Sequence, residues 1–279
     1  DKIYVSRDVE LLEEDNIKHI LEDEKIKKNV FDLKRTMVAA HRLGIHTHGL
    51  DYDMLLASYL INNENNSNDL GEIAHLYGDY SVKTDLEVYG KGKSEHIPDD
   101  DDELFNHLAS KVNAIESLKK TLLEKLKDHE QDALFDTIEI PTACVLARME
   151  MNGMKVEAST LIQLQNEFAV KLKELEDKIY GQAGEKFNLN SPKQLGHILF
   201  EKLGLPVIKK TKTGYSTSVE VLDQLKTQSP IVSEILDYRQ IAKIQSTYVK
   251  GLLDVIQPDG RVHTRYLQTL TATGRLSSV

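Results

Sequence analysis

An apolar stripe in residues 159–180 constrains the fold of this chain more than any other sequence feature. Leucine, phenylalanine and isoleucine recur there at steps of three and four residues, from Leu161 to Ile179. This spacing places the apolar side chains on one face of a helix. The stripe therefore predicts a long amphipathic helix that buries one side along its whole length.

Further helices are predicted after this stripe. Ser191-Pro192 and Ser229-Pro230 each have the form of a helix start, and the second helix is expected to run to about residue 256. Capping boxes are expected at Ser191 with Gln194 and at Thr217 with Glu220. The side chains expected to point inward are Leu195, Leu199, Leu203, Ile235, Tyr238, Ile241, Tyr248 and Leu252. Apolar and polar residues alternate in residues 261–269, which predicts a strand. The long helices, with short capped helices between them, are predicted to form an extended helical arm.

The first half of the chain mixes a short strand-like segment with helical stretches and loops, which indicates an α/β or strand-poor helical domain. A short strand is expected at Ile3–Ser6. Helices are expected within residues 31–45, 54–61 and 107–130, with loops at 62–69 and 90–103.

Charge is distributed unevenly, although the net charge of −10 argues at first against a nucleic-acid partner. Residues 1–130 hold 17 Lys and Arg against 28 Asp and Glu, whereas residues 131–279 hold 18 against 17. From Pro206 onward the basic residues outnumber the acidic ones by 10 to 6. A surface that binds an anion is therefore expected in the C-terminal third.

The sequence shows no targeting or membrane segment, and its start indicates an internal start point. It begins without Met, and no run reaches the roughly 18 apolar residues of a membrane span. The single cysteine, Cys144, lies in an apolar stretch and is expected in the core. One cysteine fits a reducing cytoplasm, and no cysteine–histidine cluster predicts a metal site.

Lysines and hydroxyls gather in KKTKTGYSTS, residues 209–218, between two expected helix starts. Free N–H groups at helix N-termini and lysine side chains suit phosphate. The segment is either a solvated loop or a surface that follows a sugar–phosphate backbone without reading sequence.

Several stretches resemble the polymerase region of family A DNA polymerases. They are PTACVLARMEMNGMKV at 141–156, FNLNSPKQLGHILFEKLGLPVIKKTKTGYSTSVEVLDQL at 187–225, YRQIAKIQSTYVKGLL at 238–253 and TATGRLSS at 271–278. The resemblance implies the start of a palm at 131–158, a mainly α-helical thumb at 159–256 and a partial α+β palm segment at 257–279.

Residues 1–130 resemble, more loosely, the 3′–5′ exonuclease domain of the same family, through GIHTHGLDYDMLLASYL at 44–60. The resemblance implies a ribonuclease H-like α/β domain, truncated at its N-terminus. Thr36 and Val112 stand where the family has metal-binding acids, Leu108 stands where it has a tyrosine, and the first acidic pair would precede Asp1. Because these side chains cannot hold metal ions, the domain is expected to be an inactive scaffold.

The TATGRLSS motif implies contact with the primer. An arginine in the minor groove can bond to the acceptor that every base presents there, which is the role expected for Arg275, with Gly274 allowing close approach. The residues expected to contact DNA are Asn188, Asn190, Ser191, Lys193, Lys209, Lys210, Lys212, Thr213, Ser216, Thr217, Ser218, Thr271, Thr273, Gly274, Arg275, Ser277 and Ser278.

The sequence is therefore interpreted as part of a DNA-directed DNA polymerase of replication and repair. By resemblance, the parent polymerase uses Mg²⁺, and the catalytic acids and the binding of deoxynucleoside triphosphates lie in palm and fingers beyond Val279. The 279 residues are expected to bind primer–template DNA as a cytoplasmic monomer, without a membrane partner, and to catalyse nothing alone. A 3′–5′ exonuclease and a non-enzymatic DNA-binding module are the alternatives.

Overall fold

A computed structural model describes residues 2–64, 67–212 and 214–279, and the chain divides into two compact units. Unit 1 comprises residues 1–153 and 263–279, and unit 2 comprises residues 154–262. Thr213, one of the predicted DNA contacts, lies outside the described residues. Within these ranges, no helix has both the length and the apolar character needed to cross a bilayer.

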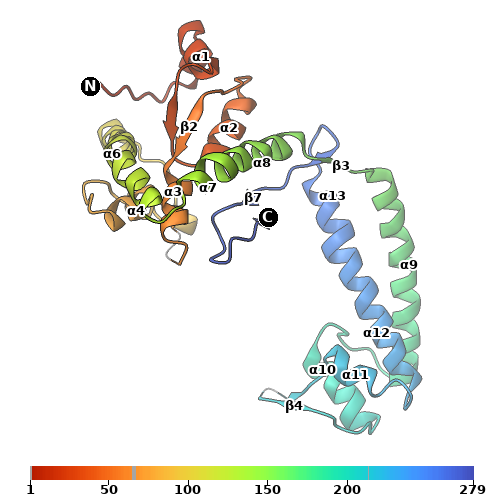
Figure 1. The fold of residues 1–279 in the computed structure, drawn as a ribbon. Coiled ribbons are helices and arrows are strands. Elements are labelled where there is room, and N and C mark those ends of the chain that lie inside the picture. Colours follow the sequence, from red (N-terminus) through yellow and green to blue (C-terminus); the bar gives the residue numbers. More distant parts are fainter. Residues whose placement is uncertain (1, 65–66, 213) are drawn as a thin grey trace. The chain divides into compact units, whose positions relative to one another are not determined.

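Unit 1 is mainly helical, with two small sheets (Figure 1). Its helices are η1 (Val9–Glu13), α1 (Asp15–Glu22), α2 (Leu33–Arg42), α3 (Met54–Ile61), α4 (Leu70–Leu76), α5 (Asp85–Tyr89), η2 (Gly92–Ser94), α6 (Asp101–Asp128), α7 (Asp132–Leu134), η3 (Phe135–Glu139) and α8 (Ile140–Asn152). Its strands are β1 (Lys28–Val30), β2 (Leu50–Asp53), β7 (Tyr266–Leu267) and β8 (Ser277–Ser278).

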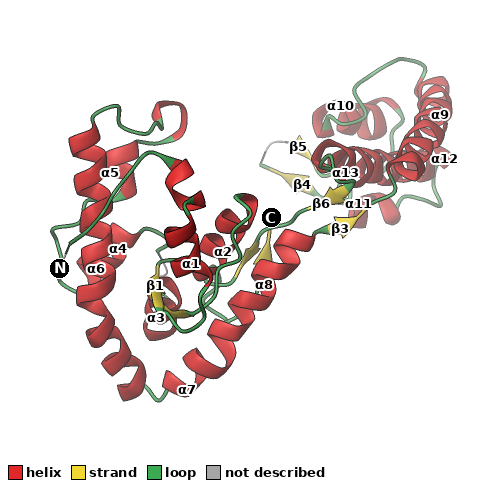
Figure 2. Ribbon diagram, turned by 90° about the horizontal axis from the view of Figure 1, so that it is seen from above, coloured by secondary structure: helices red, strands yellow, loops and turns green. Residues whose placement is uncertain are grey.

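The core of unit 1 forms around the parallel pair β1 and β2, which α2 connects (Figure 2). Leu33 from α2, Tyr52 from β2 and Met54 from α3 are almost fully buried in one cluster. Leucines at four-residue spacing on α6, from Leu118 to Leu126, close the same cluster. The amphipathic helix predicted at 107–130 is thus confirmed and begins earlier, at Asp101.

One buried carboxylate, that of Asp53, caps two helices of this core. It accepts backbone hydrogen bonds from Asp32 at 3.0 Å and Leu33 at 2.7 Å, at the start of α2. It also accepts from Leu55 at 2.9 Å and Leu56 at 3.4 Å, at the start of α3. Helix N-termini leave such N–H groups without partners, so Asp53 fixes both helices against the end of β2.

Unit 2 is built on two long antiparallel helices that lie side by side (Figure 1). Its helices are α9 (Ala158–Ala183), α10 (Pro192–Gly196), η4 (His197–Lys202), α11 (Val219–Asp223), α12 (Pro230–Lys243), η5 (Ile244–Lys250) and α13 (Gly251–Val255). Its strands are β3 (Met154–Lys155), β4 (Lys210–Thr211), β5 (Gly214–Tyr215) and β6 (Arg261–Val262), paired as β3 with β6 and β4 with β5. Ile179 of α9 and Ile235 of α12 are fully buried, which confirms the predicted apolar stripe and the helix after Pro230.

Three side chains predicted to point inward do not. Leu203, Tyr248 and Leu252 are 36%, 56% and 37% exposed. Each follows or lies within a π-helical segment, η4 or η5. A π-helical turn contains an extra residue, which shifts every later side chain out of the 3.6-residue phase, and Val249 is buried where Tyr248 was expected.

Local predictions were corrected at four other places. Ile3–Ser6 forms no strand, and the strand expected over 261–269 is two short strands, β6 and β7, in different sheets. The helix predicted to start at Thr217 starts one residue later, because Ser218 is the N-cap of α11. At Ser191 the hydroxyl does cap Gln194, but the Gln194 amide bonds back to the N–H of Asn188.

Substitution of Asp53 by alanine should destabilise unit 1 strongly. The change removes acceptors from two helix ends inside the core, so we expect a loss of about 2–4 kcal/mol in the free energy of unfolding. Urea denaturation followed by far-UV circular dichroism measures it. The control is Asp100→Ala, which removes an exposed cap that accepts from the Asp102 N–H; equal effects of the two variants would contradict the assignment.

The charge of Asp53 should also make stability depend on pH. Burial raises its pKa from 3.8 to about 6, although hydrogen bonds from Leu33, Asp32 and Leu55 act in the opposite direction. Because the folded chain binds this proton more tightly, the stabilisation is complete below about pH 3.8 and is lost as pH rises through about 6. Relative to Asp53→Asn, the unsubstituted chain should gain stability between pH 7.5 and pH 5. Urea midpoints at the two values check this, and a flat difference would contradict it.

Candidate nucleic-acid interface

Residues 265–279 of unit 1 fold back on themselves and form what we call the arginine hairpin. Strand β7 pairs antiparallel with β8, and Arg265 and Val279 exchange two backbone hydrogen bonds of 2.9 and 3.0 Å. Gly274 turns the chain at φ +73°, a conformation that a Cβ disfavours. The side chain of Arg275 is exposed, and no described residue forms an ion pair or a hydrogen bond with its guanidinium.

The base of the arginine hairpin is anchored by two acidic side chains, the buried Glu150 and the half-buried Glu139. The Tyr266 N–H donates to Glu150 Oε1 at 2.7 Å, and the same oxygen accepts from Lys34 Nζ at 2.7 Å. The amide of Gln268, 8% exposed, donates to both the carbonyl and the carboxylate of Glu139, on the turn before α8. The hairpin therefore starts from a fixed point on α8 and α2.

One of the hydroxyls expected to meet phosphate is occupied within the hairpin. Thr271 Oγ1 accepts from the Arg275 N–H at 2.9 Å and donates to the Arg275 carbonyl at 2.7 Å. Its only proton is used in that bond, so the predicted donation from Thr271 to phosphate stays a prediction and would require this bond to break. Thr273 and Ser278 are exposed and Ser277 is half-buried, so their predicted roles stay open.

A second hairpin, in unit 2, carries the lysines; we call residues 209–212 and 214–216 the lysine hairpin. Strands β4 and β5 pair antiparallel, and Ser216 N–H donates to the Lys209 carbonyl at 3.0 Å. Lys209, Lys210 and Lys212 are exposed. The ammonium of Lys210 lies 5.7 Å from the ring centre of Tyr215, a cation–π contact that leaves it at the surface.

Thr217, one of the predicted DNA contacts, is buried within unit 2. It is 6% exposed, its carbonyl accepts from Arg239 Nη1 at 2.5 Å, and its hydroxyl accepts from Arg239 Nη2 at 3.3 Å. The neighbouring Ser216 is 9% exposed, whereas Ser218 is exposed. Two consecutive residues directly after β5, Ser216 and Thr217, are therefore buried, which the sequence did not reveal.

The loop before α10 gathers the remaining predicted contacts of unit 2. Asn190 N–H donates to Asn188 Oδ1 at 2.9 Å, which tightens the turn before the helix. The Ser191 hydroxyl accepts from Gln194, which leaves its proton for another acceptor. Lys193 is exposed on α10. The structure thus brings these residues and the lysine hairpin into unit 2, and the Arg275 group into unit 1.

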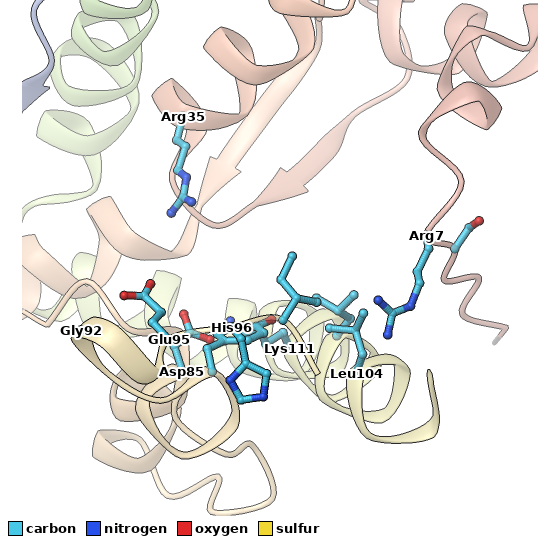
Figure 3. Close-up of a pocket in the computed structure, with 12 residues that line it drawn as sticks. Arg7, Arg35, Asp85, Gly92, Glu95, His96, Leu104 and Lys111 are labelled. Atoms are coloured by element: carbon cyan, nitrogen blue, oxygen red, sulfur yellow. Dashed lines mark hydrogen bonds and ion pairs between the residues drawn. The ribbon is translucent and has the colours of Figure 1, made fainter. Parts of the chain in front are cut away.

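Unit 1 also contains a cavity of about 830 Å³ (Figure 3). Its lining residues are Ser6, Arg7, Arg35, Asp85, Tyr89, Gly92, Glu95, His96, Ile97, Leu104, Leu108 and Lys111. Figure 3 shows Arg35 reaching in from α2, opposite Glu95, His96 and Lys111.

Most of the charges that line this cavity are already paired. Arg7 bonds to Asp101 at 2.5 Å, and Asp85 accepts from Lys111 and, at 3.0 Å, from His107 Nε2. Burial alone would raise the pKa of Asp85, but the bonds from Lys111 and His107 outweigh it and hold the pKa below its ordinary value.

The two positions of this chain at which the sequence comparison expects metal-binding acids, Thr36 and Val112, carry no carboxylate. The Thr36 hydroxyl donates to the Asp32 carbonyl at 3.0 Å, and Val112 is 48% exposed on α6. In residues 2–64, 67–212 and 214–279, no three His, Cys, Asp or Glu side chains gather so that they could hold a metal ion.

Comparison with known proteins identifies both halves of the chain. Residues 1–118 match the family described as DNA polymerase I, ribonuclease H-like domain, and residues 158–279 match DNA polymerase family A. DNA polymerase I of Bacillus subtilis is 49% identical over 99% of this chain, and that of Geobacillus stearothermophilus is 47% identical over 93%. The chain spans about a third of these relatives, 31% and 30% of their lengths.

A solved structure supports the same conclusion. The POL domain of Pol1 from M. smegmatis, in complex with DNA primer-template and dNTP, matches with a TM-score of 0.75 and 31% identity, over 94% of this chain and 43% of that one. A ribonuclease H-like exonuclease domain followed by polymerase sequence defines the class. The chain belongs to DNA polymerase family A.

Replacing Thr217 by valine tests its structural role. The variant keeps the shape but loses the hydroxyl acceptor for Arg239, so unit 2 should lose about 0.5–1.5 kcal/mol of stability. Affinity for primer–template DNA should stay within twofold of the unsubstituted chain. The control is Thr227→Val on the exposed surface of the same unit; a large loss of affinity in Thr217→Val alone would restore Thr217 as a DNA contact.

Proposed function

We propose that this chain binds primer–template DNA as part of a DNA-directed DNA polymerase. The observation that carries the proposal is the free guanidinium of Arg275, displayed on an anchored hairpin in a chain 49% identical to a DNA polymerase I. The structural relative from M. smegmatis was solved with DNA primer-template and dNTP, which supports DNA as the partner.

Arg275 suits a contact that must work with every base pair. The minor groove presents an acceptor, purine N3 or pyrimidine O2, at each base. A guanidinium with several N–H donors can bond there whichever pair is present. Such a contact responds to the shape of a correct pair rather than to sequence, as copying a template requires.

The lysine hairpin suits the sugar–phosphate backbone. Lys209, Lys210 and Lys212 present three cations on one short hairpin, and their contacts would be independent of sequence. Lys193 and the free proton of Ser191 lie on the neighbouring loop and helix start. We therefore assign phosphate binding to unit 2 and base-edge contact to Arg275.

Catalysis requires groups that these residues do not supply. Family membership indicates the use of a divalent metal ion, expected to be Mg²⁺, but the described side chains offer no group of three ligands that fits one. We propose that magnesium and deoxynucleoside triphosphates act with other parts of the polymerase. We also propose that the protein is a monomer in the cytoplasm.

Salt dependence of DNA binding tests the lysine hairpin. For the triple variant Lys209→Gln, Lys210→Gln, Lys212→Gln, we expect the slope of log affinity against log salt to fall in magnitude by about 2–3, since each released phosphate contact contributes about 0.9. Fluorescence anisotropy with labelled primer–template between 50 and 200 mM salt measures it.

A matched control separates this effect from total charge. Lys171, Lys173 and Lys178 are three exposed lysines on α9, and their triple glutamine variant has the same net charge as the first. It should keep the slope of the unsubstituted chain. Equal slopes for both triple variants would contradict phosphate binding by the lysine hairpin.

A further inference from the structure

The tip of the arginine hairpin is tied to helix α3, more than 200 residues earlier in the chain. Tyr59 Oη donates to the Thr271 carbonyl at 2.7 Å, and Asn63 Nδ2 donates to the Ala272 carbonyl at 2.9 Å. Next to them, Thr269 Oγ1 donates to Asn68 Oδ1 at 3.0 Å. These bonds join the ribonuclease H-like part of unit 1 to the segment that carries Arg275.

Three polar bonds hold this tip, and its apolar side chains are only half-buried. Leu270 and Leu276, the two large apolar side chains of the loop, are 46% and 50% exposed. Burial of those side chains therefore contributes only part of what full burial would give. Tyr59 is different, since the residue is 6% exposed and its hydroxyl donates to the hairpin.

Thr271 connects these hydrogen bonds from α3 to the backbone of Arg275. Tyr59 bonds to the carbonyl of Thr271, and the hydroxyl of the same Thr271 bonds to both the N–H and the carbonyl of Arg275. Asn63 holds the next carbonyl, that of Ala272, while Gly274 makes the turn. The backbone of Arg275 is thus fixed, although its side chain is exposed and unpaired among the described residues.

We propose that Tyr59 and Asn63 are positioning residues for Arg275, so that the exonuclease-like part sets the geometry of a DNA contact in the polymerase part. The inference rests on the proposed function. Physically, a loop ordered before binding loses less conformational entropy when Arg275 engages a base. This gives the ribonuclease H-like part a role in holding the primer that needs none of the metal-binding acids of a nuclease.

The test uses the 279-residue chain with Tyr59→Phe and Asn63→Asp. The first variant removes only the hydroxyl, and the second turns the donor toward Ala272 into an acceptor. The control, Tyr77→Phe, removes a hydroxyl that bonds to Ser58 at 3.4 Å in the same unit and does not touch the hairpin. Hydrogen exchange of the peptide covering residues 268–278, measured without DNA, should accelerate in both test variants and not in the control.

A double-mutant cycle then asks whether the tie acts through Arg275. Tyr59→Phe should weaken binding to labelled primer–template by roughly three- to tenfold, the range for one neutral hydrogen bond. In the Arg275→Ala background the same change should have less than a twofold effect, because the positioned group is gone. A purely structural role would instead give equal losses in both backgrounds.

The possible outcomes separate the two proposals. Unchanged hydrogen exchange in Tyr59→Phe and Asn63→Asp, or equal losses in both backgrounds, would overturn the positioning role. Equal affinity of Arg275→Ala and the unsubstituted chain would overturn the proposed function, and with it the link from α3 to DNA. In that case, faster hydrogen exchange in Tyr59→Phe and Asn63→Asp would show that these residues still order the hairpin and that only the proposed DNA contact is wrong.

Discussion

A buried ion pair between Lys34 and Glu150 fixes the framework on which the rest of unit 1 depends. The two side chains are 10% and 7% exposed, and Nζ lies 2.7 Å from Oε1. Removing either partner would leave an uncompensated charge inside the protein, which is far more costly than losing an exposed pair. The pair also draws in the returning chain, because Glu150 accepts from the Tyr266 N–H and its carbonyl lies 2.7 Å from His263 Nδ1. Helix α2, helix α8 and the start of the arginine hairpin are therefore held by one carboxylate and its own backbone.

The two hairpins that carry the basic side chains are anchored by different forces. In the lysine hairpin, Tyr215 packs 5.1 Å from the ring of Phe200 and so close to Gly196 that a Cβ there would lie 3.2 Å away. Apolar contact at one end thus leaves the lysines exposed at the other. In the arginine hairpin the anchors are hydrogen bonds: Glu150 accepts one at the base, and Tyr59 donates one at the tip. Hydrogen bonds have defined directions, which suits a side chain that must meet one atom, whereas lysines that follow phosphates need only be near them.

Sequence patterns predicted the elements that depend on local spacing. The stripe ending in Ile179 and the start at Pro230 are confirmed because helix period and capping act within a few residues. The predicted inward positions are wrong at η4 and η5, because counting in steps of 3.6 residues does not include the extra residue of a π-helical turn. The bonds of Tyr59 and Asn63 to the hairpin could not be predicted, because nothing in a short window of sequence marks contacts over 200 residues apart. The bonds between the Thr271 hydroxyl and the Arg275 backbone were not predicted either, because residue type alone suggested only a phosphate contact.

Several acidic residues among the first 130 have structural roles within unit 1. Asp32 and Asp100 cap helices, and Asp53 caps two at once. Asp69 caps α4 and also accepts from the Asp85 N–H at 2.6 Å, while Asp85 pairs with His107 and Lys111. Carboxylates held in this way satisfy backbone donors and neighbouring cations. Since exposed charges act over about 10 Å at moderate salt, the sign that matters to an anion is that of the nearest side chains, and on the two hairpins those are lysine and arginine. A net charge of −10 is therefore compatible with binding DNA.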